Sequence, residues 1–307
     1  MLSFLLTRLL STFIVVLGVI TLVFLLIHLV PGDPVQAMLG ETATPTDLES
    51  LRNALGLDQP LLTQWWVYIT NLLQGDLGNS LYSKEPILDI LLERFPATLE
   101  LAIAGLLVAV LLALPLGSIA ALRKDTIYDN SAMVFSLLGV SIPNFWLGPM
   151  LILLFSLMLG WLPVSGREGP LSLILPAITL GTALAAILGR MIRSTLLEVL
   201  NEDYIRTARA KGLSESAIVI YHALRNASLP IITVLGLQLG TLLGGAVITE
   251  IIFAWPGIGQ LTIESIERRD YPLVQACILL ISLSYVFINT LTDLLYAWLD
   301  PRVRYSV

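Results

Sequence analysis

Residues 9–32 read LLSTFIVVLGVITLVFLLIHLVPG and contain no Asp, Glu, Lys or Arg. A helix of roughly 20 apolar residues is long enough to cross the ~30 Å hydrocarbon core of a membrane. Other runs free of these four residue types occur at 101–122, 130–166, 169–189, 226–249 and 271–292. We therefore expect the chain to cross a membrane several times.

The composition also indicates a membrane protein. Hydrophobic residues make up 56% and charged residues 13% of the chain, and the mean hydropathy is +0.85. Soluble domains contain about 45–50% apolar and about 25% charged residues, so this chain is too poor in charge to cover a soluble surface. Only helices and closed barrels satisfy their backbone in hydrocarbon, and the alternating pattern of a barrel is absent. These properties predict an all-α polytopic membrane protein.

The run at 130–166 is longer than one span requires, and Pro143, Pro149 and Pro163 interrupt it. We interpret it as one bent helix followed by a loop, which brings the expected number of transmembrane helices to six. The predicted segments are a cytoplasmic N-terminus (1–8), spans at 9–30, 97–122, 131–160, 170–193, 231–252 and 273–298, periplasmic loops at 31–96 and 253–272, a cytoplasmic loop at 194–230 and a cytoplasmic C-terminus (299–307).

The basic residues predict this orientation, because cytoplasmic loops carry an excess of Lys and Arg. With both termini inside, most of the 17 basic residues are cytoplasmic: Arg8, Arg123, Lys124, Arg190, Arg193, Arg206, Arg209, Lys211, Arg225, Arg302 and Arg304. The net charge of −6 then reflects acidic outer loops rather than a basic or acidic partner. The first span is expected to remain as an uncleaved anchor, since no small-residue cleavage site follows it.

The outer loop at 31–96 is expected to hold short amphipathic helices. Thr46 to Glu49 has the spacing of a capping box, Gly56 is a plausible stop, and Pro60 suits a first helical position. Apolar residues then follow at helical spacing: Leu62, Trp65, Trp66, Ile69 and Leu73. This face can lie along the membrane interface or pack against the helical bundle, and amphipathicity alone does not separate the two.

The cytoplasmic loop reads DYIRTARAKGL over 203–213. It predicts one short helix that ends at Gly212 and a second that begins after the N-cap Ser214. Arginines and small residues on such a helix pair suit docking against an acidic partner surface. A loop whose charges only set the topology is the alternative.

The residues that most enzymes need are missing. None of the lysines follows a glycine, which excludes a Gly-Lys-Ser/Thr phosphate loop. His28 and His222 are the only histidines, there is no Gly-x-Ser-x-Gly elbow, and Cys277 is the single cysteine. We therefore expect no catalytic or metal site and no cofactor bound by this chain.

Two features of the later spans bear on transport. Gly236, Gly240 and Gly244 fall on one helix face, where small residues permit either close helix packing or the passage of a solute. Glu250 and Asp293 are intramembrane carboxylates near the interfaces, which keeps a proton-driven secondary transporter open as an alternative.

Several segments of the chain resemble ABC importer permeases of the oligopeptide, dipeptide and nickel group. The segments are Pro31–Pro34, Leu55–Pro60, Phe95–Leu101, Asp203–Leu213, His222–Pro230, Phe253–Gly259, Arg269–Pro272 and Asp300–Arg302. The resemblance covers nearly the whole chain and implies a type I importer fold and the role of one of two paired permease subunits.

The resemblance also implies a coupling site. In this group the cytoplasmic loop docks through a coupling helix on an ATP-binding subunit. The positions carried over are Arg206, Thr207, Ala208, Arg209, Lys211, Gly212 and Leu213, with Thr207, Ala208 and Gly212 at the centre. The broader importer pattern has Glu-Ala-Ala where this chain has Arg206-Thr207-Ala208, so the acidic contact is absent.

The partners implied are a second homologous permease subunit, two ATP-binding subunits that use ATP and Mg²⁺, and a periplasmic or lipid-anchored substrate-binding protein. The location implied is a bacterial or archaeal inner membrane, and no nucleic acid is expected. Peptides, including glutathione-like solutes, are the expected cargo, and nickel or another small solute is the alternative. A membrane-embedded structural or sensory subunit remains a further hypothesis.

Overall fold

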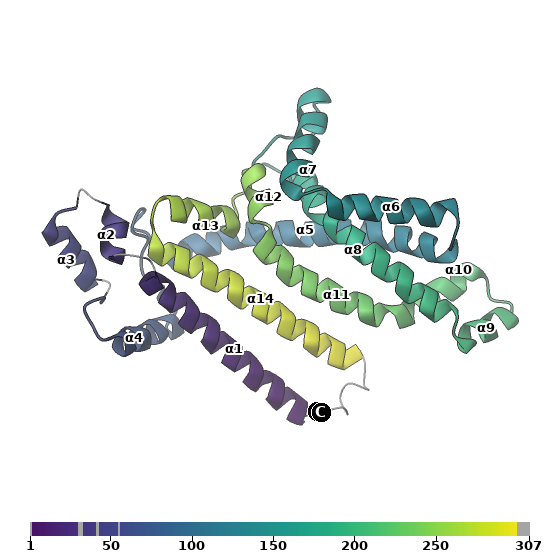
Figure 1. The fold of residues 1–307 in the computed structure, drawn as a ribbon, viewed down its shortest axis with the longest axis horizontal. Coiled ribbons are helices and arrows are strands. Elements are labelled where there is room, and N and C mark those ends of the chain that lie inside the picture. Colours follow the sequence, from purple (N-terminus) through teal and green to yellow (C-terminus); the bar gives the residue numbers. More distant parts are fainter. Residues whose placement is uncertain (1, 30–32, 41–42, 55, 300–307) are drawn as a thin grey trace. The chain divides into compact units, whose positions relative to one another are not determined.

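The computed structural model describes residues 2–29, 33–40, 43–54 and 56–299, and within these ranges it is helical, with no strand. The helices are α1 (Leu2–Leu29), α2 (Pro34–Leu39), α3 (Pro45–Ala54), α4 (Leu61–Leu73), α5 (Ile87–Leu122), α6 (Ile127–Ser141), α7 (Asn144–Leu151), η1 (Ile152–Met158), η2 (Pro170–Leu173), α8 (Ile174–Leu200), α9 (Asp203–Ala210), α10 (Glu215–Ala217), η3 (Ile218–Ala223), α11 (Leu224–Gly245), α12 (Val247–Ile252), α13 (Ile258–Glu267) and α14 (Tyr271–Leu299) (Figure 1).

Helices long and apolar enough to cross a membrane cover Arg8–Leu29, Ile87–Leu122, Pro170–Leu200, Glu215–Gly244 and Tyr271–Leu295. A sixth candidate is the pair Ile127–Ser141 and Asn144–Met158, if the two helices count as one span. The predicted all-α polytopic fold is confirmed.

The expected single bent helix near Pro143 is two helices that meet at 101°. Proline disfavours the helical conformation in the residue before it, and Ile142 accordingly has an extended backbone with ψ 115°. α7 begins directly after Pro143 and continues, past Pro149, into the π-helical turn η1. The angle between α6 and α7 is therefore much sharper than an ordinary helix bend.

The chain divides into two compact units. We call Thr98–Trp255 together with Phe287–Val307 the first unit, and Leu2–Ala97 together with Pro256–Val286 the second unit. The core of the second unit is formed by side chains of α5, α13 and α14, namely Ile87, Leu91, Ile258, Leu261, Leu273, Ala276 and Cys277.

α8 is the central helix of the first unit, where it packs against α6, α7 and α11 (Figure 1). Glycines of α8 and α5 allow these two helices to approach closely. A Cβ on Gly181 would lie 2.5 Å from the carbonyl oxygen of Gly105, and a Cβ on Gly117 would lie 2.6 Å from that of Gly189. Such small-residue contacts bring helix backbones together in membranes.

The capping box of α3 lies two residues earlier than the sequence pattern suggested. Helix α3 begins at Pro45, and Thr44, not Thr46, makes the capping bonds. The Thr44 hydroxyl accepts from the Asp47 N–H at 3.3 Å, while the Asp47 carboxylate accepts from the Thr44 N–H at 3.1 Å and from its hydroxyl at 2.6 Å. Proline is favoured at the first helical position because it has no N–H to leave unpaired.

The other predicted signals in this loop lie close to where they were expected. Gly56 has φ +65°, and Leu57 N–H donates to the Arg52 carbonyl at 3.0 Å, as in a glycine-terminated helix. Pro60 is the N-cap of α4, one residue before its expected place in the helix.

Candidate coupling site

The loop predicted to be cytoplasmic contains the short helix α9, a tight turn and α10, which continues without a break through η3 into α11. α9 buries Ile205 and Ala208, which are three residues apart and share one face. This helix packs against η3, whose Ile218, Val219 and Ala223 are also buried. The apolar face of α9 is therefore held by the chain itself.

Gly212 ends α9 with a Schellman motif. The Leu213 N–H donates to the Ala208 carbonyl at 3.3 Å and the Gly212 N–H donates to the Arg209 carbonyl at 2.9 Å. This motif needs a left-handed residue, for which glycine is preferred, and Gly212 has φ +79°. Ser214 then caps α10 by accepting from the Ala217 N–H at 3.4 Å. The predicted helix end and the predicted N-cap are both confirmed.

Two side-chain contacts cross-link this loop. Arg209 donates from Nε and Nη2 to the carboxylate of Glu215, at 2.8 and 3.2 Å, and these hydrogen bonds raise the pKa of Arg209. The Asn226 amide of α11 donates to the Tyr204 hydroxyl of α9 at 2.8 Å. α9 is therefore tied to both α10 and α11. The sequence contains these residues but no periodic signal that pairs them.

Most of the predicted coupling residues are exposed: Arg206, Thr207, Arg209, Lys211, Gly212 and Leu213. Ala208 differs, because it is only 6% exposed and faces the rest of the chain. Arg206 makes a solvent-exposed contact with Asp203 at 3.3 Å, and the Thr207 hydroxyl donates to the Asp203 carbonyl at 3.0 Å. The outer surface of α9 is thus polar and carries charges of both signs.

A groove beside α9 and α10 is lined by the ends of α5 and α8. Its charged and polar residues are Arg123, Lys124, Asn201, Arg209 and Glu215. The guanidinium of Arg123 also lies over the Tyr128 ring at 4.3 Å. Cations from two segments distant in sequence therefore meet on one surface of the first unit.

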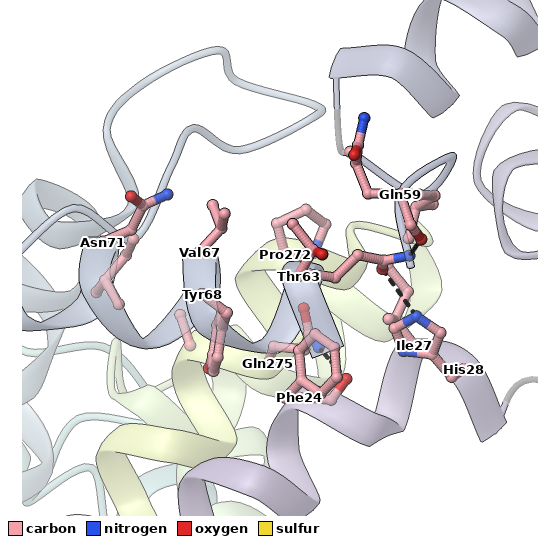
Figure 2. Close-up of a pocket in the computed structure, with 15 residues that line it drawn as sticks. Phe24, Ile27, His28, Gln59, Thr63, Val67, Tyr68, Asn71, Pro272 and Gln275 are labelled. Atoms are coloured by element: carbon pink, nitrogen blue, oxygen red, sulfur yellow. Dashed lines mark hydrogen bonds between the residues drawn. The ribbon is translucent and has the colours of Figure 1, made fainter. Parts of the chain in front are cut away.

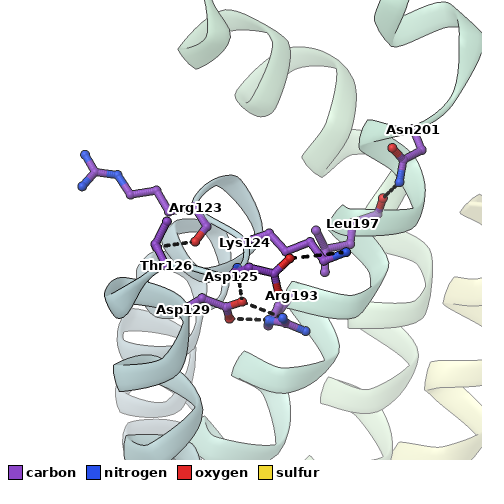
Figure 3. Close-up of polar contacts among 8 residues, drawn as sticks. All are labelled: Arg123, Lys124, Asp125, Thr126, Asp129, Arg193, Leu197 and Asn201. Atoms are coloured by element: carbon purple, nitrogen blue, oxygen red, sulfur yellow. Dashed lines mark hydrogen bonds and ion pairs between the residues drawn. The ribbon is translucent and has the colours of Figure 1, made fainter.

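The turn between α5 and α6 is fixed to α8 by an ion pair (Figure 3). Arg193 donates from Nε and Nη2 to the two carboxylate oxygens of Asp129, at 2.6 and 2.7 Å. Asp129 also accepts from the backbone N–H of Asp125, which has φ +61°. From the sequence, Arg193 was counted only among the residues that set the membrane orientation. No role was assigned to Asp129.

The pathway candidates lie in or next to α11. A Cβ on Gly236 would lie 2.1 Å from the Thr292 hydroxyl, so this glycine permits close packing of α11 on α14. Gly240 is buried and Gly244 is exposed. Glu250 is fully buried and accepts from the Thr98 hydroxyl at 2.8 Å, so it is hydrogen-bonded rather than solvated.

The second unit contains a cavity of about 210 Å³ between α1, α4 and the start of α14 (Figure 2). The Gln64 amide donates to the Gln59 carbonyl at 2.7 Å, which turns its oxygen toward His28 Nε2, 3.0 Å away. Nε2 must then carry the proton, which leaves His28 Nδ1 as a buried acceptor without a partner in the described residues. The lining contains no carboxylate, Lys or Arg.

No group of three or more His, Cys, Asp or Glu in the described part of the chain is arranged to hold a metal ion. The α9–α10 loop offers an exposed, charged surface beside the groove that contains Arg123 and Lys124. Such a surface is suited to binding a partner.

Comparison with known proteins identifies the family. Residues 1–102 match the N-terminal part of the membrane component of binding-protein-dependent transport systems, and residues 113–305 match the inner membrane component itself. The glutathione transport system permease protein of Escherichia coli (strain K12) is 46% identical over 306 residues, covering 100% of both chains. The protein of the same name from Salmonella choleraesuis (strain SC-B67) is 45% identical over the same length.

Solved structures share the fold. A chain of an inward-facing methionine ABC transporter has a TM-score of 0.60 at 19% identity and covers 70% of this chain and 99% of its own length. A chain of an amino acid ABC transporter has a TM-score of 0.51 at 16% identity, covering 70% of this chain and 94% of its own. This chain therefore belongs to the family of inner-membrane components of binding-protein-dependent transport systems, as the permease subunit of an ABC importer rather than an enzyme.

Proposed function

We propose that this permease imports peptides, with glutathione-like tripeptides as the preferred solutes, and forms one half of their path through the membrane. The observation that carries the proposal is identity of 45–46% along the whole chain to proteins named for glutathione transport. A second, homologous permease subunit forms the other half. A periplasmic or lipid-anchored binding protein delivers the solute.

The α9–α10 loop is the contact for an ATP-binding subunit in this proposal, and two such subunits bind ATP and Mg²⁺. Arg206, Thr207, Lys211, Gly212 and Leu213 supply the exposed surface. Support comes from the bonds behind that surface, since Arg209–Glu215 and Tyr204–Asn226 tie α9 to its neighbours. In this proposal, a displacement of α9 also displaces α11, because the two helices are joined by these bonds.

Both termini are cytoplasmic in the proposed orientation. The groove that contains Arg123, Lys124 and Arg209 supports it, because the α5–α6 turn and the coupling loop meet there on one surface. An excess of Lys and Arg on one side is typical of the cytoplasmic face. The residue boundaries predicted for the spans belong to the same proposal.

The four pathway candidates have different roles in this proposal. Gly236 and Gly240 serve helix packing, for which the close approach of Thr292 to Gly236 is the support. Exposed Gly244 is the position that faces a solute. Glu250 holds α12 in place through Thr98.

Reconstitution tests the proposal. Proteoliposomes that contain this chain, its permease partner and the ATP-binding subunits should accumulate labelled glutathione only when ATP and the binding protein are both present. The chain reconstituted alone should neither hydrolyse ATP nor transport. ATP hydrolysis by the isolated chain, or uptake that persists without the ATP-binding subunits, would overturn the importer mechanism.

The solute class is tested separately in the same proteoliposomes. Unlabelled di- and tripeptides should compete with labelled glutathione, whereas a nickel chelate should not. Uptake of a labelled nickel chelate, with no uptake of labelled glutathione, would replace the peptide assignment and leave the importer mechanism intact.

A further inference from the structure

Helix α4 is a charge-free segment within an otherwise polar loop. No Asp, Glu, Lys or Arg occurs between Pro60 and Gly75, and α4 itself reads LLTQWWVYITNLL. The preceding helix, α3, is different, because it contains Asp47, Glu49 and Arg52. The two helices of this loop are therefore suited to different surroundings.

One face of α4 packs on α1. The Trp65 indole N–H donates to the Thr21 hydroxyl at 3.2 Å, and the His28 ring is hydrogen-bonded to Gln64. The rings of Tyr68 and Phe24 lie 5.7 Å apart. Figure 2 shows Tyr68 of α4 and Phe24 and His28 of α1 among the residues that line the cavity. α4 is thus attached along the side of α1 over more than one turn.

These contacts lie within the membrane-spanning part of α1, which covers Arg8–Leu29. At a rise of 1.5 Å per residue, Thr21 lies about 12 Å along the helix from Leu29. Half of a hydrocarbon core of ~30 Å is about 15 Å. With the hydrocarbon edge placed at Leu29, Trp65 contacts α1 within the hydrocarbon, and α4 lies beside the span and not above it.

The opposite face of α4 is apolar and uncovered. Leu62, Trp66 and Leu73 are 80%, 62% and 82% exposed. Their spacings of four and seven residues put them on one side of the helix. On α1, Leu22 and Leu29 are 65% and 71% exposed, so the neighbouring helix also presents apolar side chains.

We propose that α4 is a lipid-embedded interfacial helix, with Leu62, Trp66 and Leu73 inserted among the acyl chains of the leaflet in which α1 ends. The absence of charge, the depth of the Trp65 contact and the continuity with the exposed apolar side of α1 all favour lipid as the occupant of this face. The Trp65 indole N–H has a partner at this depth, because it donates to the Thr21 hydroxyl and so is not left unpaired in hydrocarbon. The inference requires only that α1 spans the membrane, and it is independent of the solute.

The test uses single cysteines labelled with the environment-sensitive fluorophore NBD, in nanodiscs. Leu62→Cys and Leu73→Cys probe the apolar face. Asn71→Cys is the control on the other side of α4, and Glu49→Cys is the water-exposed control on α3. The native Cys277 is fully buried and stays in place, so unmodified chain serves as the labelling blank.

Labels at 62 and 73 should emit at shorter wavelength than the label at 49. Lipids with a nitroxide on the acyl chain should quench them several-fold more, and aqueous iodide several-fold less, than the label at 49. Equal quenching by iodide at 62, 73 and 49 would overturn the proposal.

The same measurement in the assembled transporter excludes a protein partner as the cover. Acyl-chain quenching at 62 and 73 that persists with all subunits present supports lipid contact. Loss of that quenching on assembly would show that another subunit covers this face, which would also overturn the proposal. Variants whose labels give the unmodified gel-filtration profile and near-native helical content are the ones compared.

Discussion

Arg193 of α8 forms a two-point ion pair with Asp129 of α6, with N–O distances of 2.6 and 2.7 Å. The Asp129 side chain is 3% exposed and that of Arg193 is 23% exposed. The pair holds the first turn of α6 against α8 (Figure 3), and α8 leads directly into the coupling loop. It is therefore a rigid connection behind the surface proposed to bind the ATP-binding subunit.

Asp129→Asn should lower the free energy of unfolding by about 2 kcal/mol, because it weakens two hydrogen bonds to a charged group at a part-buried site. Asp203→Asn is the control, since its contact with Arg206 is solvent-exposed and such pairs contribute about 0–1 kcal/mol. Denaturant unfolding of the two variants in lipid nanodiscs measures the difference. Equal losses would show that the Asp129 pair is no stronger than a surface contact.

Gly212→Ala should weaken coupling, because a left-handed conformation costs a residue with a Cβ about 1–2 kcal/mol. Gly212→Asn should be tolerated better, since Asn visits this conformation more readily. Gly212→Pro should be the most severe, because proline cannot adopt φ +79° and has no N–H to donate to the Arg209 carbonyl. The measurement is solute taken up per ATP hydrolysed by the complete transporter. Unchanged uptake in the proline variant, with normal membrane insertion, would remove the coupling role.

Glu250→Gln should retain ATP-driven uptake within about twofold, because the amide oxygen can still accept from the Thr98 hydroxyl and one hydrogen bond contributes only about 1 kcal/mol. Glu250→Leu removes that acceptor and should reduce the amount of folded protein. A proton-driven transporter would behave differently, since glutamine cannot exchange a proton. Abolished uptake in a stably folded glutamine variant would therefore favour that mechanism.

Tyr68→Phe should leave stability unchanged or raise it. The Tyr68 hydroxyl is buried without a hydrogen-bond partner among the described residues. Trp65→Phe is the matched control on the same helix, because it removes the hydrogen bond to Thr21 and should cost about 1 kcal/mol. Thermal unfolding compares them. A larger loss for Tyr68→Phe would mean that the hydroxyl has a partner, such as an ordered water.

The start of α3 should depend on pH. Hydrogen bonds from Thr44, first from its side chain and then from its backbone, lower the pKa of Asp47 below its ordinary value of 3.8. A carboxyl with a lowered folded-state pKa stabilises the fold above its unfolded-state pKa and loses that effect as the pH falls through the folded value. The cap should therefore persist at neutral pH and open in acid below 3.8. A carboxyl NMR titration of Asp47 in the full chain checks this, and Thr44→Ala should return the pKa toward 3.8.

The sequence by itself determined the features that depend on neighbours within one or two turns. Charge-free runs identified the apolar helices, because a backbone in hydrocarbon must form its own hydrogen bonds. Gly212 and Ser214 marked the helix end and start in the coupling loop, since capping needs only local geometry. The capping residue of α3 was predicted two residues too late, because both Thr44 and Thr46 are suitable N-cap residues. The helix begins at Pro45, so Thr44 is the one that makes the capping bonds.

Only the tertiary structure decided which distant groups meet. Asp129 and Arg193 are 64 residues apart, and Thr98 and Glu250 are 152 apart, so no local periodicity pairs them. Ala208 faces inward because Ile205 and Ala208 share the side of α9 that packs on η3. For α4, the sequence predicted an apolar helix. Which face of that helix is covered depends on its packing against α1. Side-chain partners depend on where whole helices pack, and that is a property of the folded chain.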